Sequence, residues 1–147
     1  MSIQQQLFAL LSGATAAGIR VYPLTAPAAV VKPYIVYQRI SYNSENVLSG
    51  STGLANTKMQ IDVYDLTYGG VVALSAQVDA LMSAWAVQNV SGNATDLYES
   101  DVMLHRMTCD YSIWHPTDSS VIVPTYYITD GAGNFLGDGA GNRLTWN

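Results

Sequence analysis

The stretches Pro33-Tyr-Ile-Val-Tyr-Gln-Arg-Ile-Ser-Tyr42 and Thr57-Lys-Met-Gln-Ile-Asp-Val-Tyr-Asp65 decide the fold of this chain. The first is rich in β-branched and aromatic residues, which favours a strand. In the second, Met59, Ile61 and Val63 alternate with polar residues, so one face of this strand should be buried and the other wet. Neither stretch is dominated by a catalytic group. This regularity without chemistry favours an assembly or binding module over an active site.

The segment Asn43-Ser-Glu-Asn-Val-Leu-Ser-Gly-Ser-Thr-Gly53 joins the two strands and consists mostly of turn-forming residues. It is too long for a tight hairpin, so we expect a mobile loop that projects from the sheet. Long loops of this kind commonly carry function. The candidate partner-contact residues in or beside this loop are Tyr42, Asn43, Glu45, Asn46, Val47 and Leu48.

Two helices flank these strands in the sequence. The first begins at Ser2, a good N-cap, and places apolar residues at helical spacing until Ser12. A proline-rich connector over residues 23–33 leads into the first long strand. The longest helix is predicted over residues 68–86, with its apolar stripe lying across Met59, Ile61 and Val63. The members of that stripe are Val71, Leu74, Val78, Leu81, Met82 and Trp85.

The second half of the chain adds strands. Residues 87–90 are predicted as a short strand before a turn at 91–93, and residues 102–114 as a third long strand that turns Cys109 toward the helix. The predicted fold class is α+β: a small mixed or antiparallel sheet packed against one long helix, with an N-terminal helix and a long strand-connecting loop. The chain length fits one such domain, over residues 1–115, with an extension over 116–147.

The extension contains a repeat of eight residues, Asp130-Gly-Ala-Gly-Asn-Phe-Leu-Gly137 followed by Asp138-Gly-Ala-Gly-Asn-Arg-Leu-Thr145. Two glycines and an asparagine in each copy indicate a short hairpin or solenoid-like rung, which is too small to bury a core alone. We therefore expect a C-terminal β-arm that pairs with something else. The candidate contact residues in this arm are Phe135, Leu136, Leu144 and Trp146.

The composition excludes several function classes. Charged residues make up 12% of the chain and apolar residues 49%, so we expect partners to cover part of the surface. The net charge is −5 and the six Lys and Arg residues are scattered singly, which argues against a nucleic-acid clamp. The start of the chain lacks a secretory signal, and no apolar run is long enough to span a bilayer. We expect a cytosolic site of synthesis and no membrane.

Residues that could carry chemistry have simpler structural interpretations. His105 and His115 are ten residues apart, a spacing that does not suggest a metal pair. Cys109, the only cysteine, shares its strand face with apolar residues, so a core role is favoured over a nucleophile. Glu99 and Asp101 could share acid-base work, but a strand entrance is the better interpretation. We expect no enzymatic activity, cofactor or metal.

The glycine repeat and the tyrosines each leave a second interpretation open. The repeat places Leu136 where a dinucleotide motif needs its third glycine, and its two Asp residues supply few oxygens for calcium. Tyrosines gather around the two central strands and could form a base-stacking platform. Without basic neighbours, sheet packing or a protein interface is favoured. These tyrosines are Tyr34, Tyr37, Tyr42, Tyr64 and Tyr68.

Several short motifs, in a fixed order, resemble the tail-completion or tail-terminator proteins of long-tailed bacteriophages. They are Ala26-Pro27, the run from Lys32 to Arg39, Glu45-Asn46 with Leu48-Ser-Gly50, and Met59-Gln-Ile-Asp-Val-Tyr64 followed by Tyr68. The resemblance covers about residues 3 to 114 and does not include the repeat.

The resemblance implies a function as well as a fold. It implies a homo-oligomeric ring, expected to have six subunits, that caps the head-proximal end of the tail tube and stops its growth. The implied partners are the tail-tube protein and the head-completion or neck proteins, while genomic DNA passes through the pore without specific binding. The protein would be made in the host cytoplasm and would reside in the virion tail or neck. It would have no enzymatic activity.

Other interpretations remain. A tail-tube or head-completion subunit would share the small α+β architecture and would also oligomerise. A small hydrolase is a remote alternative, because no nucleophile-base pair stands at persuasive spacing. A small-molecule binding module would require a closed apolar pocket.

Overall fold

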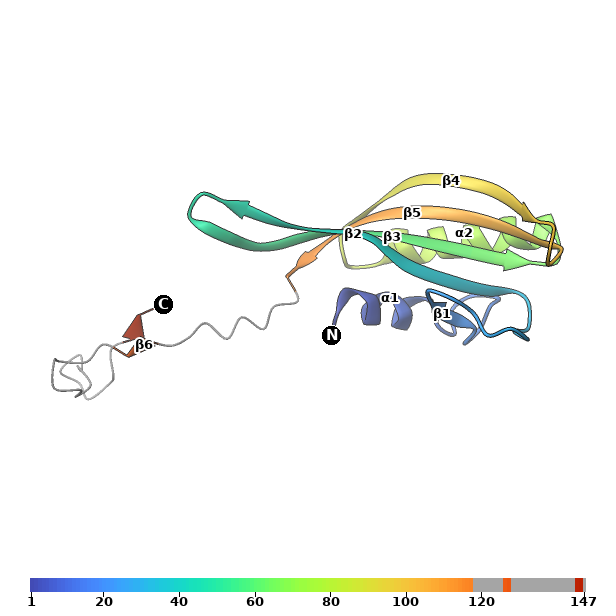
Figure 1. Ribbon diagram of the computed structural model, residues 1–147, viewed down its shortest axis with the longest axis horizontal. Helices are drawn as coiled ribbons and strands as arrows, with labels where there is room; N and C mark the ends of the chain where they lie inside the picture. The colour runs from blue at the N-terminus through green and yellow to red at the C-terminus, as the bar shows by residue number, and fades with distance from the viewer. Residues whose placement is uncertain (118–125, 128–144, 147) are drawn as a thin grey trace.

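A computed structural model of the chain describes residues 1–117, 126–127 and 145–146. The described part is α+β, as predicted, with a five-stranded mixed sheet and two helices (Figure 1). The sheet has the order β1-β2-β3-β5-β4; β1 runs parallel to β2, and all other neighbours are antiparallel. The elements of this domain are α1 (Ile3–Leu11), β1 (Val21–Pro23), β2 (Tyr34–Val47), β3 (Gly50–Asp65), α2 (Tyr68–Ala84), β4 (Asn89–Glu99) and β5 (Leu104–Pro116).

Both helices pack on one face of the sheet, and α2 lies along β3 and β5 (Figure 1). The predicted contact is confirmed, because Met59, Ile61 and Val63 are fully buried in one cluster with Leu74 and Val78 of α2. On β5, Cys109, Tyr111 and Ile113 face this same cluster, as the alternation predicts. Each fully buried apolar side chain stabilises the fold by about 1.5–3 kcal/mol. This layer is the main core.

The start of α1 matches its sequence signal. Ser2 Oγ accepts a hydrogen bond from the Gln5 N–H at 3.2 Å, and Gln5 Oε1 accepts one from the Ser2 N–H at 2.9 Å. This reciprocal pair is a capping box, which satisfies backbone donors that the first turn leaves free.

The prediction of one long helix is not matched, because both helices are short. α2 has 17 residues and α1 has 9. α2 ends at Ala84 because Trp85 has an extended backbone, with φ −69° and ψ 137°, and packs back against the core instead of continuing the helix. The second helix is therefore one of two that cover the sheet, and α1 contributes Ile3, Leu7 and Leu11 to the same core.

The opposite face of the sheet is covered only where β2 begins. There the proline-rich connector lays Ala26 and Val30 against Tyr34, Val36 and Leu104. The ring of Tyr34 also stacks on that of Tyr64, with 4.7 Å between centroids. The first residues of β2 are therefore buried on both faces, while the rest of this face is open and polar.

The predicted long loop between the central strands is wrong. β2 continues to Val47, β3 begins at Gly50, and only Leu48 and Ser49 separate them, so the segment is a β-hairpin. Register shifts between Arg39 and Ser41 and between Ser44 and Asn46 absorb the residues that do not pair regularly. Gly50 adopts φ +131°, a conformation that other residues rarely adopt. Backbone pairing outweighs the polar composition of this segment.

The predicted turn at residues 91–93 is also wrong, because these residues belong to β4. A register shift between Ser91 and Ala94 lets the strand pass through Gly92 and Asn93 while it stays paired with β5. A Cβ on Gly92 would lie 3.2 Å from the carbonyl oxygen of Asp110, so this glycine allows a close strand approach. β4 thus has eleven residues instead of the short strand predicted at 87–90.

Two further short strands are described, β6 (Tyr126–Tyr127) and β7 (Thr145–Trp146). They pair antiparallel, with Tyr126 opposite Trp146. The repeat lies outside the described residues except for its last residue, Thr145, and the predicted contact residues Phe135, Leu136 and Leu144 also lie outside them. The division into a domain of residues 1–115 and an arm of 116–147 stays a prediction.

Candidate interaction surfaces

The hairpin of β2 and β3 projects beyond the rest of the sheet (Figure 1). Every residue from 42 to 54 is exposed, although a strand in a packed sheet ordinarily buries alternate side chains. At its tip Val47 is more than half exposed and Leu48 fully exposed. These two apolar side chains contribute nothing to the core. Burying these two side chains against another molecule would therefore stabilise that contact.

Backbone pairing holds the base of this hairpin in place. β3 pairs with β5 as far as Leu54 and Pro116, and the Thr117 N–H donates to the Gly53 carbonyl oxygen at 2.8 Å. Within the hairpin, the Thr52 hydroxyl donates to the Glu45 carbonyl oxygen at 2.7 Å. The hairpin is thus an ordered projection, with three strands at its base and two at its tip.

The structure places six of the predicted contact residues on this hairpin: Tyr42, Asn43, Glu45, Asn46, Val47 and Leu48. Tyr42 lies near the base instead of the tip, with its ring centroid 5.8 Å from the Arg39 guanidinium and 6.3 Å from the His115 ring centroid. Of the predicted arm residues, only Trp146 is described, in β7. Their role as partner contacts stays a prediction.

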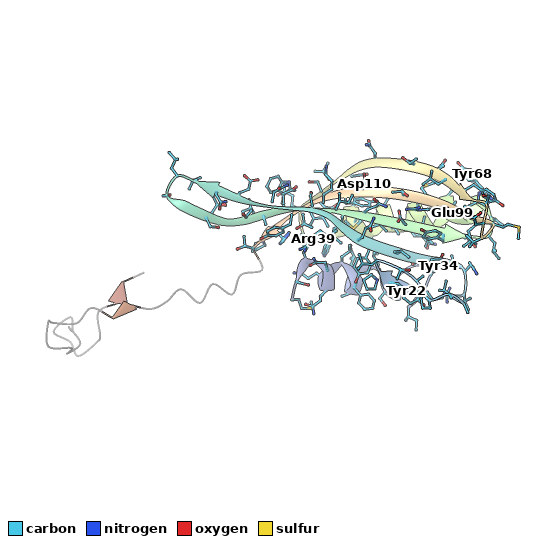
Figure 2. All side chains as sticks on the ribbon, viewed as in Figure 1. Tyr22, Tyr34, Arg39, Tyr68, Glu99 and Asp110 are labelled. Carbon is cyan, nitrogen blue, oxygen red and sulfur yellow. The ribbon has the colours of Figure 1, made fainter. Side chains whose placement is uncertain are left out.

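A second exposed apolar surface lies at the opposite end of the sheet, where β3 ends, α2 begins and β4 turns into β5. We call it the distal surface and define it by Leu66, Tyr68, Tyr98, Val102 and Met103, each more than half exposed. Figure 2 shows Tyr68 and Glu99 at this end.

Polar contacts and backbone conformation shape the distal surface. The Tyr68 hydroxyl donates to Asp96 Oδ2 at 2.9 Å, and the rings of Tyr68 and Tyr98 flank that of His105, with centroids 6.0 Å and 5.0 Å from it. Met103 has a φ of +52°, which is uncommon for a residue with a side chain. The turn holds an apolar side chain outward in a strained conformation. Monomeric proteins rarely expose apolar clusters of this kind without a partner.

An ion network lies near the distal surface, on the face of the sheet that the connector partly covers. Arg106 Nη2 lies 2.9 Å from Asp62 Oδ2, and Arg106 Nη1 lies 2.9 Å from Glu99 Oε1. The side chain of Asp62 is only 6% exposed and that of Arg106 is 23% exposed, while the Arg106 guanidinium also lies over the Tyr64 ring. The network joins β3, β5 and β4. Its partners are all satisfied by one another except Arg106 Nε, which is buried without a described partner.

A cavity of about 360 Å³ lies beside this network, between the connector and the sheet. Its lining includes the ionisable side chains of Lys32, Asp62 and Arg106 among apolar connector residues. This lining is partly charged, whereas a small-molecule binding module would need a closed apolar pocket.

The residues considered as catalytic candidates, such as Cys109 and His115, have roles in packing and hydrogen bonding within the fold. Cys109 is buried in the core, and burial raises the pKa of its thiol to about 11, with Asp79 adding to the shift. The thiol is therefore protonated at neutral pH, whereas a nucleophilic cysteine needs a thiolate. His115 Nδ1 lies 2.7 Å from the Pro116 carbonyl oxygen, which can only accept, so Nδ1 donates this hydrogen bond, and Nε2 lies 2.7 Å from the Thr57 hydroxyl.

The other candidate residues, Glu99 and Asp101, do not form a shared site. Glu99 pairs with Arg106, while Asp101 is exposed in the turn after β4. Within residues 1–117 and the two short strands, no cluster of three potential ligands could hold a metal ion. None of the helices described is both long and apolar enough to cross a membrane.

The distal surface and most of β4 were not predicted from the sequence. In β4, polar and apolar residues fall on both faces, and Gly92 and Asn93 suggested a turn. The distal surface combines residues from two segments, 66–68 and 98–103, that are far apart in the sequence. Its members had no shared spacing from which to predict it.

Comparison with known proteins identifies a family for the five-stranded domain. A family model described as tail completion protein gp17 matches residues 2–116, which is most of the chain and the whole five-stranded domain. The comparison with curated proteins gives no significant match.

Proposed function

Because this chain belongs to the tail completion protein gp17 family, and so has a structural role in a bacteriophage tail, we propose that it forms a ring that caps the tail tube. The ring stops tube growth at the head-proximal end and joins the tail to the head or neck. The expected number of subunits is six. The protein acts by assembly and catalyses no reaction.

The main support for this proposal is the projecting hairpin of β2 and β3. It is ordered, projects from a compact body and exposes Val47 and Leu48 at its tip. An ordered projection with an apolar tip suits insertion into a surface of a neighbouring ring, because little conformational entropy is lost when it binds. We assign the hairpin to the contact with the tail-tube protein.

The distal surface supports the joining role. It lies at the opposite end of the sheet from the hairpin, so one subunit can contact two partners without overlap. A protein that caps the tail tube and also joins the tail to the head needs a contact surface at each end. We assign the distal surface to the head-completion or neck protein.

Passage of DNA through such a ring requires weak contact with phosphates. Of the five Lys and Arg residues that the structure describes, Arg106 is paired with carboxylates, Arg20, Lys32 and Arg39 lie on or beside β1 and β2, and Lys58 lies on β3. So few cations in a chain of net charge −5 support a pore that lets DNA pass without specific binding.

The C-terminal arm has a separate proposed role. Its glycine-rich repeat, which is outside the family match, adds a strand to an exposed sheet edge of a neighbouring subunit or ring. Deleting residues 130–147 should weaken ring assembly or tube docking. Unchanged assembly and docking would contradict this role.

The test of the capping role is a shortened hairpin. Ser44 pairs with Ala55, so replacing residues 45–54 by Asn-Gly closes a tight turn and keeps the buried Ala55 in place. This variant should fold and lose capping, seen as tails of irregular length in a complementation assay with phage that lack the protein. A shortened variant that still terminates tails at normal length would contradict the proposal.

A tail-tube subunit is the second candidate, since it would share the small α+β architecture and would also oligomerise. Polymerisation separates the two: a tube protein forms open-ended stacks, whereas a cap stops at a single closed ring. Light-scattering mass across a concentration series distinguishes a fixed size from continued growth.

A further inference from the structure

We propose that the two edges of the sheet are the two halves of the contact between neighbouring copies of this chain, with β4 of one copy against the β1–β2 edge of the next. This inference rests on the proposed ring and names the surfaces that would close it. It follows from the strand order, the strand directions and the distribution of charge.

Both edges are open in the part of the chain that the structure describes. β4 is the last strand of the sheet, with eleven residues, and pairs only with β5. At the other edge, β1 covers β2 only from Ile35 to Tyr37, so the outer side of β2 from Gln38 onward has no strand beside it. Proteins usually protect such edges with Lys or Pro, and β4 contains neither.

The strand directions permit head-to-tail pairing. β2 and β5 run one way, while β3 and β4 run the other. Copies related by a ring axis keep the same orientation, so β4 of one copy meets the β1–β2 edge of the next as an antiparallel neighbour. The alternation of the sheet then continues from one subunit into the next.

The two edges carry opposite charge. Arg20, Lys32 and Arg39 lie on or beside β1 and β2, with Glu45 farther along β2 in the hairpin, while the β4 edge carries Asp96 and Glu99, with Asp101 in the turn that follows. Thus three of the five described Lys and Arg residues are at one edge, and three carboxylates are at the other. A subunit with this polarity repels a wrongly oriented copy and attracts a correctly oriented one.

The charges also lie at matching heights along the strands. Leu97 pairs with Arg106, Arg106 with Tyr64, and Tyr64 with Tyr34, so Leu97 and Tyr34 are level across the sheet. Arg20 precedes Val21, which pairs with Ile35, and is therefore level with Tyr34 as well. In a side-by-side copy without axial offset, the carboxylates at positions 96 and 99 flank the height of Arg20.

Most of these charges are uncompensated inside one subunit. Within the described residues, ion pairs involve only Arg106, Asp62 and Glu99, so Arg20, Lys32 and Arg39 have no carboxylate partner. The Arg20 guanidinium donates to the carbonyl oxygens of Ala16 and Pro33, which hold it in place without neutralising it. A second copy would supply the missing negative charge.

A charge exchange tests the contact in the full-length protein. Lys32→Glu and Asp101→Lys each place like charges across the proposed interface, whereas the double variant exchanges the two signs. Arg20 and Glu99 are left unchanged because they hold hydrogen bonds within the subunit. Lys58→Glu is the matched control, since Lys58 is exposed on β3 in the middle of the sheet.

The readout is the mass of the purified chain by light scattering at low salt, alone and after addition of tail tubes. Each single variant should weaken association about tenfold, the double variant should restore it, and the control should match wild type. A second measurement uses disulfide trapping between Cys residues introduced at Ser41 and Val90, which are level across the sheet through Lys58 and Ser112. A covalent dimer is expected.

The outcomes separate this inference from the proposed function. Ring formation by wild type with no loss in either single variant and no trapped dimer would overturn the edge contact and leave the ring intact. Failure of wild type to oligomerise, with or without tail tubes, would overturn both. Loss in the single variants without recovery in the double variant, and without trapping, would also contradict the edge contact.

Discussion

The Thr117 backbone N–H donates a hydrogen bond to the Gly53 carbonyl oxygen, with 2.8 Å between the two atoms. This bond joins the end of β5 to the β3 strand of the hairpin, beyond the last β3–β5 pair at Leu54 and Pro116. Three strands therefore brace the base of the hairpin, and only its outer part stands alone. An exposed hairpin of two strands would be marginal without such support.

Substitution at the hairpin tip should separate folding from function. Leu48→Asp places a charge on a fully exposed side chain, so the free energy of unfolding should change by less than about 0.5 kcal/mol. Tail capping should fall sharply, because the apolar contact is lost. Val72→Asp is the control, since Val72 is also exposed but lies on α2, outside the hairpin and both sheet edges. Equal capping by the two variants would count against a contact at the tip.

A core substitution should destabilise the fold without a direct effect on either surface. Leu74 is buried between α2 and the sheet, so Leu74→Ala should lower the free energy of unfolding by about 2–5 kcal/mol. Chemical denaturation followed by circular dichroism measures this loss. A loss below about 1 kcal/mol would mean that α2 is not packed on β3 and β5 as described.

Removal of the Arg106 side chain should destabilise the fold, because it leaves the Asp62 carboxylate buried without its ion-pair partner. Arg106→Met deprives the buried Asp62 carboxylate of its partner, which should cost roughly 1–3 kcal/mol. The double variant Arg106→Met with Asp62→Leu removes both charges and should recover much of the loss. Denaturation of the three proteins forms a double-mutant cycle. Additive losses would show that the two side chains do not interact.

Stability should fall at alkaline pH. The thiol of Cys109 has its pKa raised by burial from 9.0 to about 11, so above pH 9 the unfolded chain loses this proton first and is favoured. Burial and the neighbouring Asp79 raise the pKa of Tyr111 in the same direction. This part of the stability is therefore fully present below pH 9 and is lost as the pH rises through 11.

Denaturation midpoints between pH 7 and pH 11 check this dependence. The double variant Cys109→Ala with Tyr111→Phe should show a smaller fall than wild type over the same range. Identical slopes would mean that these two groups do not set the alkaline limit. The wild-type thiol should also react slowly with a disulfide reagent until the chain unfolds.

Much of the domain could be predicted from the sequence. The alternation of Met59, Ile61 and Val63 and the helical spacing of Leu74 and Val78 each encode burial within one element. Such periodicity depends on local geometry and survives in the fold. The pattern therefore predicted the central layer of helix on sheet.

The hairpin and β4 could not be predicted in the same way. Their side chains are exposed on both faces, so no alternation of apolar and polar residues marks the segments as strands. Pairing with β3 and β5 determines their conformation, and Gly92 lies within β4 while Gly50 begins β3. The residues from Tyr42 to Leu48 that were predicted to contact a partner lie in a braced hairpin instead of a loop, and their contact with a partner stays a prediction.

The most direct test of the proposed capping ring is electron microscopy of the purified protein mixed with open tail tubes. We predict one closed ring, expected to be six-fold, at a single end of each tube, and no further addition of tube subunits at that end. Open-ended stacks of this protein, or tubes that continue to grow through the ends where it is bound, would contradict this prediction.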